Sequence, residues 1–253
     1  MKKNSRILLL ALAGSAVSAT GVPLSVVLQL PLGTTTPGKR SLVYFLHREK
    51  SVWLERHEGI IHVGITAQGR RRLSAQFPAL LVREPLQSPE WQLLLLKQAP
   101  KNDPHFRSLA VLCKKFRVLR LARGVYAYPG PLPAELESQL TSLYAEDHLA
   151  RCTVKDWVSG LDRPVIVSYY DIENLSAIYS SISSDLNRLL MPILPNKESS
   201  YRTISSICSV LDRLESALSS DCGLVQRFFP KTAFSSDLVD QVGSVMISIQ
   251  LPE

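Results

Sequence analysis

The chain has few of the residues that mark disulfide-rich, metal-binding or low-complexity proteins. Its four cysteines in 253 residues are too few for a disulfide scaffold, and no two of them are spaced as Cys-x-x-Cys. The five histidines form no His-x-x-x-His pair, so a zinc site would need ligands from distant parts of the chain. Glycine (12) and proline (16) are ordinary in number, which excludes collagen-like and low-complexity classes. We therefore expect buried reduced thiols, no metal site and no cofactor.

No apolar run is long enough to span a membrane, which takes about 20 residues. The run from Ile7 to Ala13 follows basic residues and precedes Val17-Ser18-Ala19, which is the layout of a secretory signal peptide. Cleavage there would give a secreted or envelope protein that begins near Thr20. The alternative is a buried first helix over 7–17. A core of some 60 residues needs such an apolar helix to bury enough surface, so we favour the helix, a cytoplasmic protein and no membrane contact.

Positive charge is concentrated at one end of the chain. Residues 1–83 carry twelve basic and three acidic residues, a net charge of +9, whereas residues 84–253 carry a net charge of −2. Apolar residues make up 45% of the chain, so a sizeable core can form around this basic module. Such an asymmetry favours contact with a polyanion from one end of the molecule.

Residues 20–83 have the pattern of a helix-turn-helix followed by a hairpin. A short apolar helix is expected over 23–30, and a second helix begins at Thr36-Pro37, where a hydroxyl caps the helix and proline needs no N–H partner. Its expected apolar face consists of Leu42, Val43, Phe45 and Leu46. Two strands, 52–56 and 60–65, flank the tight turn Glu58-Gly59. Thr66 then caps a further basic helix.

This order predicts a winged helix-turn-helix over 1–83 that places the second helix in the major groove of double-stranded DNA. The candidate DNA-binding residues are basic or hydrogen-bonding side chains on that helix, on the hairpin and on the following helix: Lys39, Arg40, Tyr44, His47, Arg48, Arg56, His57 and Arg70. The competing interpretation is that these charges solvate the exposed face of an ordinary helix. Residues 70–72 in particular fit solvated surface better than base readout.

The rest of the chain predicts two further units, so the expected class is α+β. Residues 90–157 alternate as strand, helix, two strands, helix and strand, the βαββαβ order of a ferredoxin-like domain. After a linker at 160–164, residues 163–253 form a mainly helical C-terminal region with helices over 172–190 and 201–218. A loop is expected over 191–199, and the segment 238–249 has a mixed pattern. Tyr169, Tyr170 and Tyr201 fit packing better than a ligand pocket.

Four segments resemble the PaaX-like family of phenylacetic-acid-degradation repressors. They are Arg6-Ile-Leu-Leu-Leu-Ala-Leu-Ala-Gly, Gly64-Ile-Thr-Ala-Gln-Gly-Arg-Arg-Arg-Leu73, and Trp91-Gln-Leu-Leu-Leu-Leu with Leu121-Ala-Arg-Gly-Val-Tyr-Ala-Tyr-Pro129. The resemblance covers roughly residues 5–157. It implies a cytoplasmic transcriptional regulator, usually a homodimer, with a winged helix and a domain similar to the small CRISPR-adaptation endonuclease. In that family the C-terminal region aids dimerisation and the response to a small-molecule effector.

A metal-dependent nuclease is the enzymatic alternative. Active members of the endonuclease group carry an aspartate near the end of the first strand, where this chain has Leu96-Lys97-Gln98 and the nearest acid is Asp103. A lysine there repels a divalent cation. We therefore expect no catalytic residues and a domain that serves pairing or packing.

Overall fold

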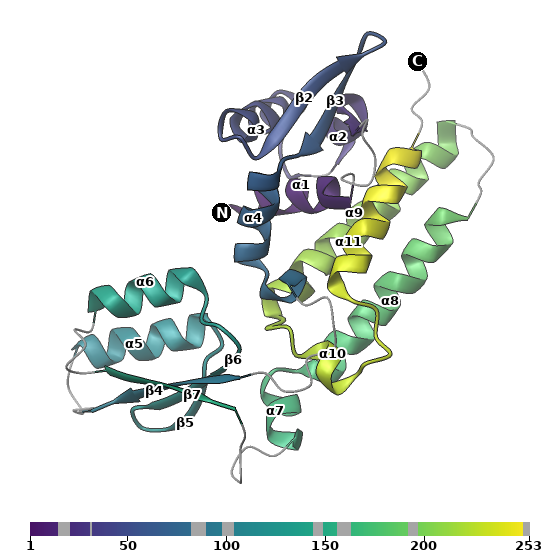
Figure 1. The fold of residues 1–253 in the computed structure, drawn as a ribbon. Coiled ribbons are helices and arrows are strands. Elements are labelled where there is room, and N and C mark those ends of the chain that lie inside the picture. Colours follow the sequence, from purple (N-terminus) through teal and green to yellow (C-terminus); the bar gives the residue numbers. More distant parts are fainter. Residues whose placement is uncertain are drawn as a thin grey trace.

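The computed structural model describes residues 1–14, 21–30, 32–81, 90–97, 104–143, 149–155, 163–191 and 197–249. It is a mixed α+β fold, mostly helical, with one three-stranded and one four-stranded antiparallel sheet (Figure 1). Both Val17-Ser18-Ala19 and Asp103 lie outside the described residues. No helix within the described ranges has the length and hydropathy needed to cross a membrane.

The N-terminal elements wrap a small sheet in the order β1-β3-β2. They are α1 (Lys3–Ala13), β1 (Val22–Pro23), α2 (Leu24–Gln29), α3 (Thr36–Arg48), β2 (Val52–His57), β3 (Ile60–Ile65), α4 (Ala67–Gln76) and the 3-10 helix η2 (Pro78–Leu81). Strands β2 and β3 form the predicted hairpin, with Val52 opposite Ile65 and His57 opposite Ile60. Its turn residues Glu58 and Gly59 both have positive φ, 51° and 85°, as a two-residue hairpin turn requires.

Helix α1 is the centre of the main hydrophobic core. Leu8, Leu9 and Leu10 are fully buried, because α1 contacts β3 and α4 on one side and the C-terminal helices α9 and α11 on another. A helix that is apolar on every face is stable only when it is enclosed in this way. The structure thus confirms the expected buried helix at the apolar run. Helix α1 ends at Ala13, and residues 15–17 of the expected helix lie outside the described residues.

The middle unit has its own core and the expected βαββαβ element order. Its elements are β4 (Trp91–Leu96), α5 (Pro104–Lys115), β5 (Leu119–Ala122), β6 (Val125–Pro129), α6 (Ala134–Leu143) and β7 (Leu149–Val154). The sheet order is β5-β6-β4-β7, and α5 and α6 cover one face of the sheet (Figure 1). Leu94, Leu109, Tyr126, Tyr128 and Leu136 form the core between the sheet and these helices.

The C-terminal region is helical, as expected, but its boundaries differ from the predicted ones. It contains α7 (Arg163–Tyr169), α8 (Ile172–Leu190), α9 (Lys197–Ser220), α10 (Val225–Phe228) and α11 (Ser235–Ser248). The bounds of α8 agree with the predicted helix over 172–190. The predicted linker overlaps the start of α7, the predicted loop overlaps the start of α9, and the segment of mixed pattern is the helix α11. Burial of α11 against α1 and α8 explains its apolar residues on several faces.

The central place of α1 makes a stability prediction. Leu9→Ala should lower the free energy of unfolding by about 2–5 kcal/mol, because it removes buried methyl groups and leaves a cavity. Urea unfolding followed by circular dichroism measures the change. Leu81→Ala is the matched control, since the Leu81 side chain is 64% exposed, and equal losses for both variants would contradict a core centred on α1.

Candidate nucleic-acid interface

Helix α3 has a defined start and a defined end. The cap is Thr35, one residue before the predicted Thr36, and its hydroxyl accepts a hydrogen bond from the Gly38 amide at 3.4 Å. At the other end the Ser51 amide donates to the Leu46 carbonyl and the Lys50 amide to the His47 carbonyl, both at 2.8 Å. Lys50 has a positive φ of 55°, so the pair of bonds forms a Schellman motif that stops the helix.

The exposed face of α3 carries Arg40, Tyr44, Phe45 and Arg48. Tyr44 is 52% exposed and Phe45 is 46% exposed, so the prediction that Phe45 faces the core was wrong. At 3.6 residues per turn Phe45 lies roughly 160° around the helix from the buried Val43, which turns it to solvent. The Arg48 guanidinium lies 5.8 Å from the centroid of the Phe45 ring. This face therefore combines positive charge with two exposed aromatic rings.

Two of the candidate residues on α3 bond to the protein's own backbone. The Lys39 ammonium donates to the Leu28 carbonyl at 2.9 Å, which satisfies an acceptor at the end of α2. The His47 Nδ1 atom lies 3.2 Å from the Val52 carbonyl oxygen and links α3 to β2. Both contacts orient α3 on its neighbours, a role that helical periodicity does not reveal.

The hairpin places Arg56 and His57 next to its turn, and both side chains are exposed. The His57 Nε2 atom lies 3.2 Å from a carboxylate oxygen of Glu55, and its ring meets the edge of the His62 ring at a centroid distance of 5.6 Å. The β2–β3 hairpin lies near α2 and α3, and its turn points away from the middle unit (Figure 1). Arg56 is thus the exposed cation nearest the turn.

Arg70 does not lie with the candidate residues of α3. It lines a hollow between α4 and α11, together with Asp237 and Asp240. Three other N-terminal cations are held by carboxylates: Lys3 by Asp212 at 3.0 Å, Arg6 by Glu215 at 2.6 Å and Arg72 by Glu49 at 3.1 Å. Within the described part of the chain, Arg40, Arg48 and Arg56 have no ion-pair partner, so α3 and the hairpin carry unpaired positive charge. The same holds of Arg70 and Arg71 on α4 and of Lys2 and Lys50, which are also exposed.

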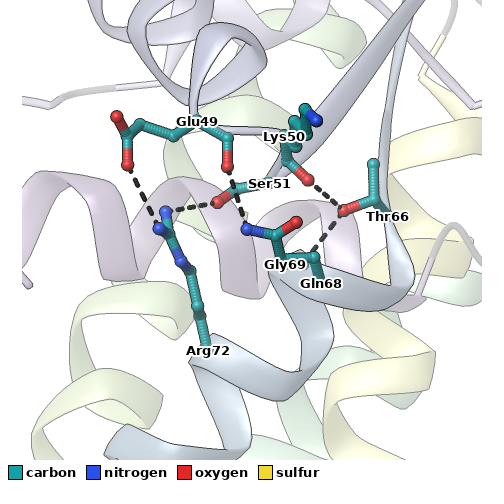
Figure 2. A network of polar contacts seen from close by, with 7 residues as sticks. All are labelled: Glu49, Lys50, Ser51, Thr66, Gln68, Gly69 and Arg72. Atoms are coloured by element: carbon teal, nitrogen blue, oxygen red, sulfur yellow. Dashed lines mark hydrogen bonds and ion pairs between the residues drawn. The ribbon is translucent and has the colours of Figure 1, made fainter.

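A polar network joins the end of α3 to the start of α4 (Figure 2). The Thr66 hydroxyl donates to the Lys50 carbonyl at 2.6 Å and accepts from the Gly69 amide at 3.0 Å, as expected of a helix cap. The Arg72 guanidinium donates to the Ser51 hydroxyl and to the Glu49 carboxylate, each at 3.1 Å. The sequence predicted the Thr66 cap, but nothing in it pairs Glu49 with Arg72, which are 23 positions apart.

The described residues hold no group of three histidine, cysteine, aspartate or glutamate side chains that could bind a metal ion. The cysteines in this part of the chain are unpaired thiols. Burial raises the pKa of Cys113 to about 12 and that of Cys208 to about 11, so both stay protonated at neutral pH.

Comparisons with known proteins leave the family open. No protein-family model matches the chain, and no curated protein matches its sequence. A solved structure of an uncharacterized protein from Mycobacterium tuberculosis is similar, with 14% sequence identity and a TM-score of 0.49. The match covers 96% of this chain and 94% of that one.

The junction between α3 and α4 makes a second stability prediction. Gly69→Ala should lower the free energy of unfolding by about 1–3 kcal/mol, because a Cβ atom there would lie 2.0 Å from the Ser51 carbonyl oxygen. In an open helix interior the same change stabilises by about 0.5–1 kcal/mol, so the two cases differ in sign. Thermal and urea unfolding measure the effect, with the neighbouring Gln68→Ala as the control. A Gly69→Ala protein more stable than the parent would contradict this packing.

Proposed function

We propose that the protein is a DNA-binding transcriptional regulator that reads duplex DNA with α3 and the β2–β3 hairpin. The observation that carries the proposal is the exposed face of α3, where Arg40 and Arg48 have no ion-pair partner among the described residues and lie on the same element as Tyr44 and Phe45. The hairpin adds Arg56 near its turn. Arginines on an exposed helix can contact phosphates or guanine edges, and an aromatic ring can pack against a thymine methyl group.

The arrangement of the N-terminal elements supports a winged helix-turn-helix. The chain order α1-β1-α2-α3-β2-β3, a three-stranded sheet ordered β1-β3-β2 and a hairpin beside α3 are features of that motif. Gly33, with a φ of 59°, lies between α2 and α3, where the motif needs a tight turn. In this interpretation α2 crosses the DNA backbone and α3 lies in the major groove.

The middle unit supports a ferredoxin-like domain, because a βαββαβ chain with helices on one sheet face is the split βαβ arrangement. The relation to PaaX-like repressors, the cytoplasmic location and the homodimer are parts of the same proposal. The homodimer follows from DNA geometry, since helix-turn-helix proteins commonly bind two half-sites about one helical turn apart.

DNA binding is tested by the double variant Arg40→Ala/Arg48→Ala. We expect it to lose about 2–5 kcal/mol of binding free energy on a duplex selected from a random library, because both guanidinium groups contact the DNA. Fluorescence anisotropy at several salt concentrations measures the affinity. The parent protein's log affinity should fall steeply with log salt, and the variant's slope should be shallower by about 1 to 2.

The matched control is Arg107→Ala/Arg188→Ala, which removes two exposed arginines on α5 and α8. It should bind much like the parent protein. A parent protein with no salt-dependent affinity for any duplex would contradict the proposed function. An Arg40/Arg48 variant that binds like the parent would contradict the assignment of α3 as the reading helix.

A further inference from the structure

The sheet of the middle unit has two edge strands, β5 and β7, and they are built differently. Strand β5 has four residues, and its register against β6 is interrupted between Arg120 and Ala122. A short length and a bulge both make an edge a poor template for another strand. Strand β7 has six residues, and all of them pair with β4 in an unbroken register from Leu149 to Val154. The edge at β5 is thus protected against a further strand in a way that the edge at β7 is not.

The outer edge of β7 is accessible. Among the strands that the structure describes, β4 alone pairs with β7, and Arg151, Cys152 and Thr153 in the middle of β7 are exposed. A strand that is paired on one side presents a row of backbone N–H and C=O groups on its other side. Such a row can bind another strand through main-chain hydrogen bonds.

A charged side chain can block an edge, but the described contacts turn Arg151 towards α6. Arg151 is opposite the buried Leu94, on the sheet face that the helices cover, and its guanidinium lies 2.9 Å from the Glu137 carboxylate of α6. Thr153 shares this face and accepts a hydrogen bond from the Gln92 side chain at 3.1 Å. Cys152 lies between them on the other face as a free, exposed thiol. The side chains of β7 therefore leave its backbone open to a partner.

The sequence of β7 is self-complementary about Cys152. Two copies of a strand that are related by a two-fold axis pair antiparallel, so each residue meets one that is equally far from the axis in the other direction. With the axis at Cys152, Ala150 meets Val154 on one face and Arg151 meets Thr153 on the other. An axis at 151 would place two copies of Arg151 opposite each other, and an axis at 153 would place Arg151 opposite Lys155. Like charges directly opposite destabilise a strand pair, so the register centred on Cys152 is favoured.

We propose that β7 pairs with β7 of a second copy of this chain, antiparallel and with the two-fold axis at Cys152, so that the two sheets join into one continuous sheet. The choice of a second copy rests on the homodimer of the proposed function, whereas the pairing itself needs no DNA. One strand pair is a small interface with few hydrogen bonds, so we expect a weak dimer with a dissociation constant on the order of micromolar.

Sedimentation velocity of the full-length protein without DNA, from about 1 to 100 μM, should show a monomer that converts to a dimer as the concentration rises. Thiol cross-linking tests the register in the same samples. Directly opposite residues of antiparallel strands have Cα atoms about 4.5–5.5 Å apart, which a disulfide can span. Diamide, a thiol oxidant, should therefore give a covalent dimer on a non-reducing gel, and Cys152→Ser should abolish it. Cross-linking that persists in Cys152→Ser, or a dimer that diamide does not link, would overturn the proposed pairing.

Charge exchange at the axis is the sharper test. Cys152→Glu and Cys152→Lys should each weaken the dimer at least tenfold, because two like charges then meet, and an equimolar mixture of the two should restore it. Ala122→Glu, which adds the same carboxylate at an exposed position of the other edge strand, is the matched control and should dimerise like the parent. Circular dichroism and melting temperature establish that all variants are folded.

The proposed interface is wrong if the parent protein stays monomeric, if Cys152→Glu dimerises like the parent, or if the mixture stays monomeric. These measurements contain no DNA, so each of those results leaves DNA binding to the anisotropy experiment. Conversely, a dimer of the predicted register without affinity for any duplex would contradict the proposed function and leave the β7 interface standing.

Discussion

The burial of α1 is the constraint on which the arrangement of the molecule depends. One helix, apolar on all sides, fills the space between the hairpin sheet and the C-terminal helices, and residues of both regions belong to one hydrophobic core. The polar start of α1 strengthens this placement. Arg6 donates from Nε and from an Nη atom to Glu215, whose side chain is only 5% exposed, and its guanidinium lies 5.9 Å from the Phe77 ring centroid. A carboxylate this deeply buried needs such a partner, so breaking the pair costs more than forming it contributes.

Helix α9 has two different faces: one packs against α1 and the other lines a cavity. Asp212 and Glu215 lie on the face that meets α1, whereas Arg213, Ser216, Ala217 and Ser220 line that cavity, which has a volume of about 260 Å³ and lies beside the middle unit. At 3.6 residues per turn the two faces are roughly 120° apart. The same helix therefore connects the apolar centre of the N-terminal elements to that cavity. A displacement of α9 would be felt on both sides, because packed interiors transmit strain.

Local sequence signals predicted the elements well, and long-range contacts account for the differences. The Thr66 cap, the Glu58-Gly59 turn and the bounds of α8 depend on neighbours a few residues away, and all three were found as expected. The exposure of Phe45 depends on which side of α3 meets the sheet. The surroundings of the Arg70 side chain include residues of α11, which lies more than 160 residues further along the chain. Periodicity places a side chain on a face of its helix but does not identify what covers that face.

The net charge of the N-terminal segment does not tell where its cationic side chains lie in the fold. A net charge of +9 over residues 1–83 counts every cation equally, yet the fold directs Lys3 and Arg6 to carboxylates on α9 and Arg72 to Glu49. A cation that already has a carboxylate partner must give up that contact to bind a phosphate, so it contributes less to binding a polyanion. The pairing thus reduces the number of cations that are free to attract a polyanion, and the arginines of α3 and the hairpin are among those that remain. Charge that is placed on an exposed helix orients an approaching anion as well as attracting it.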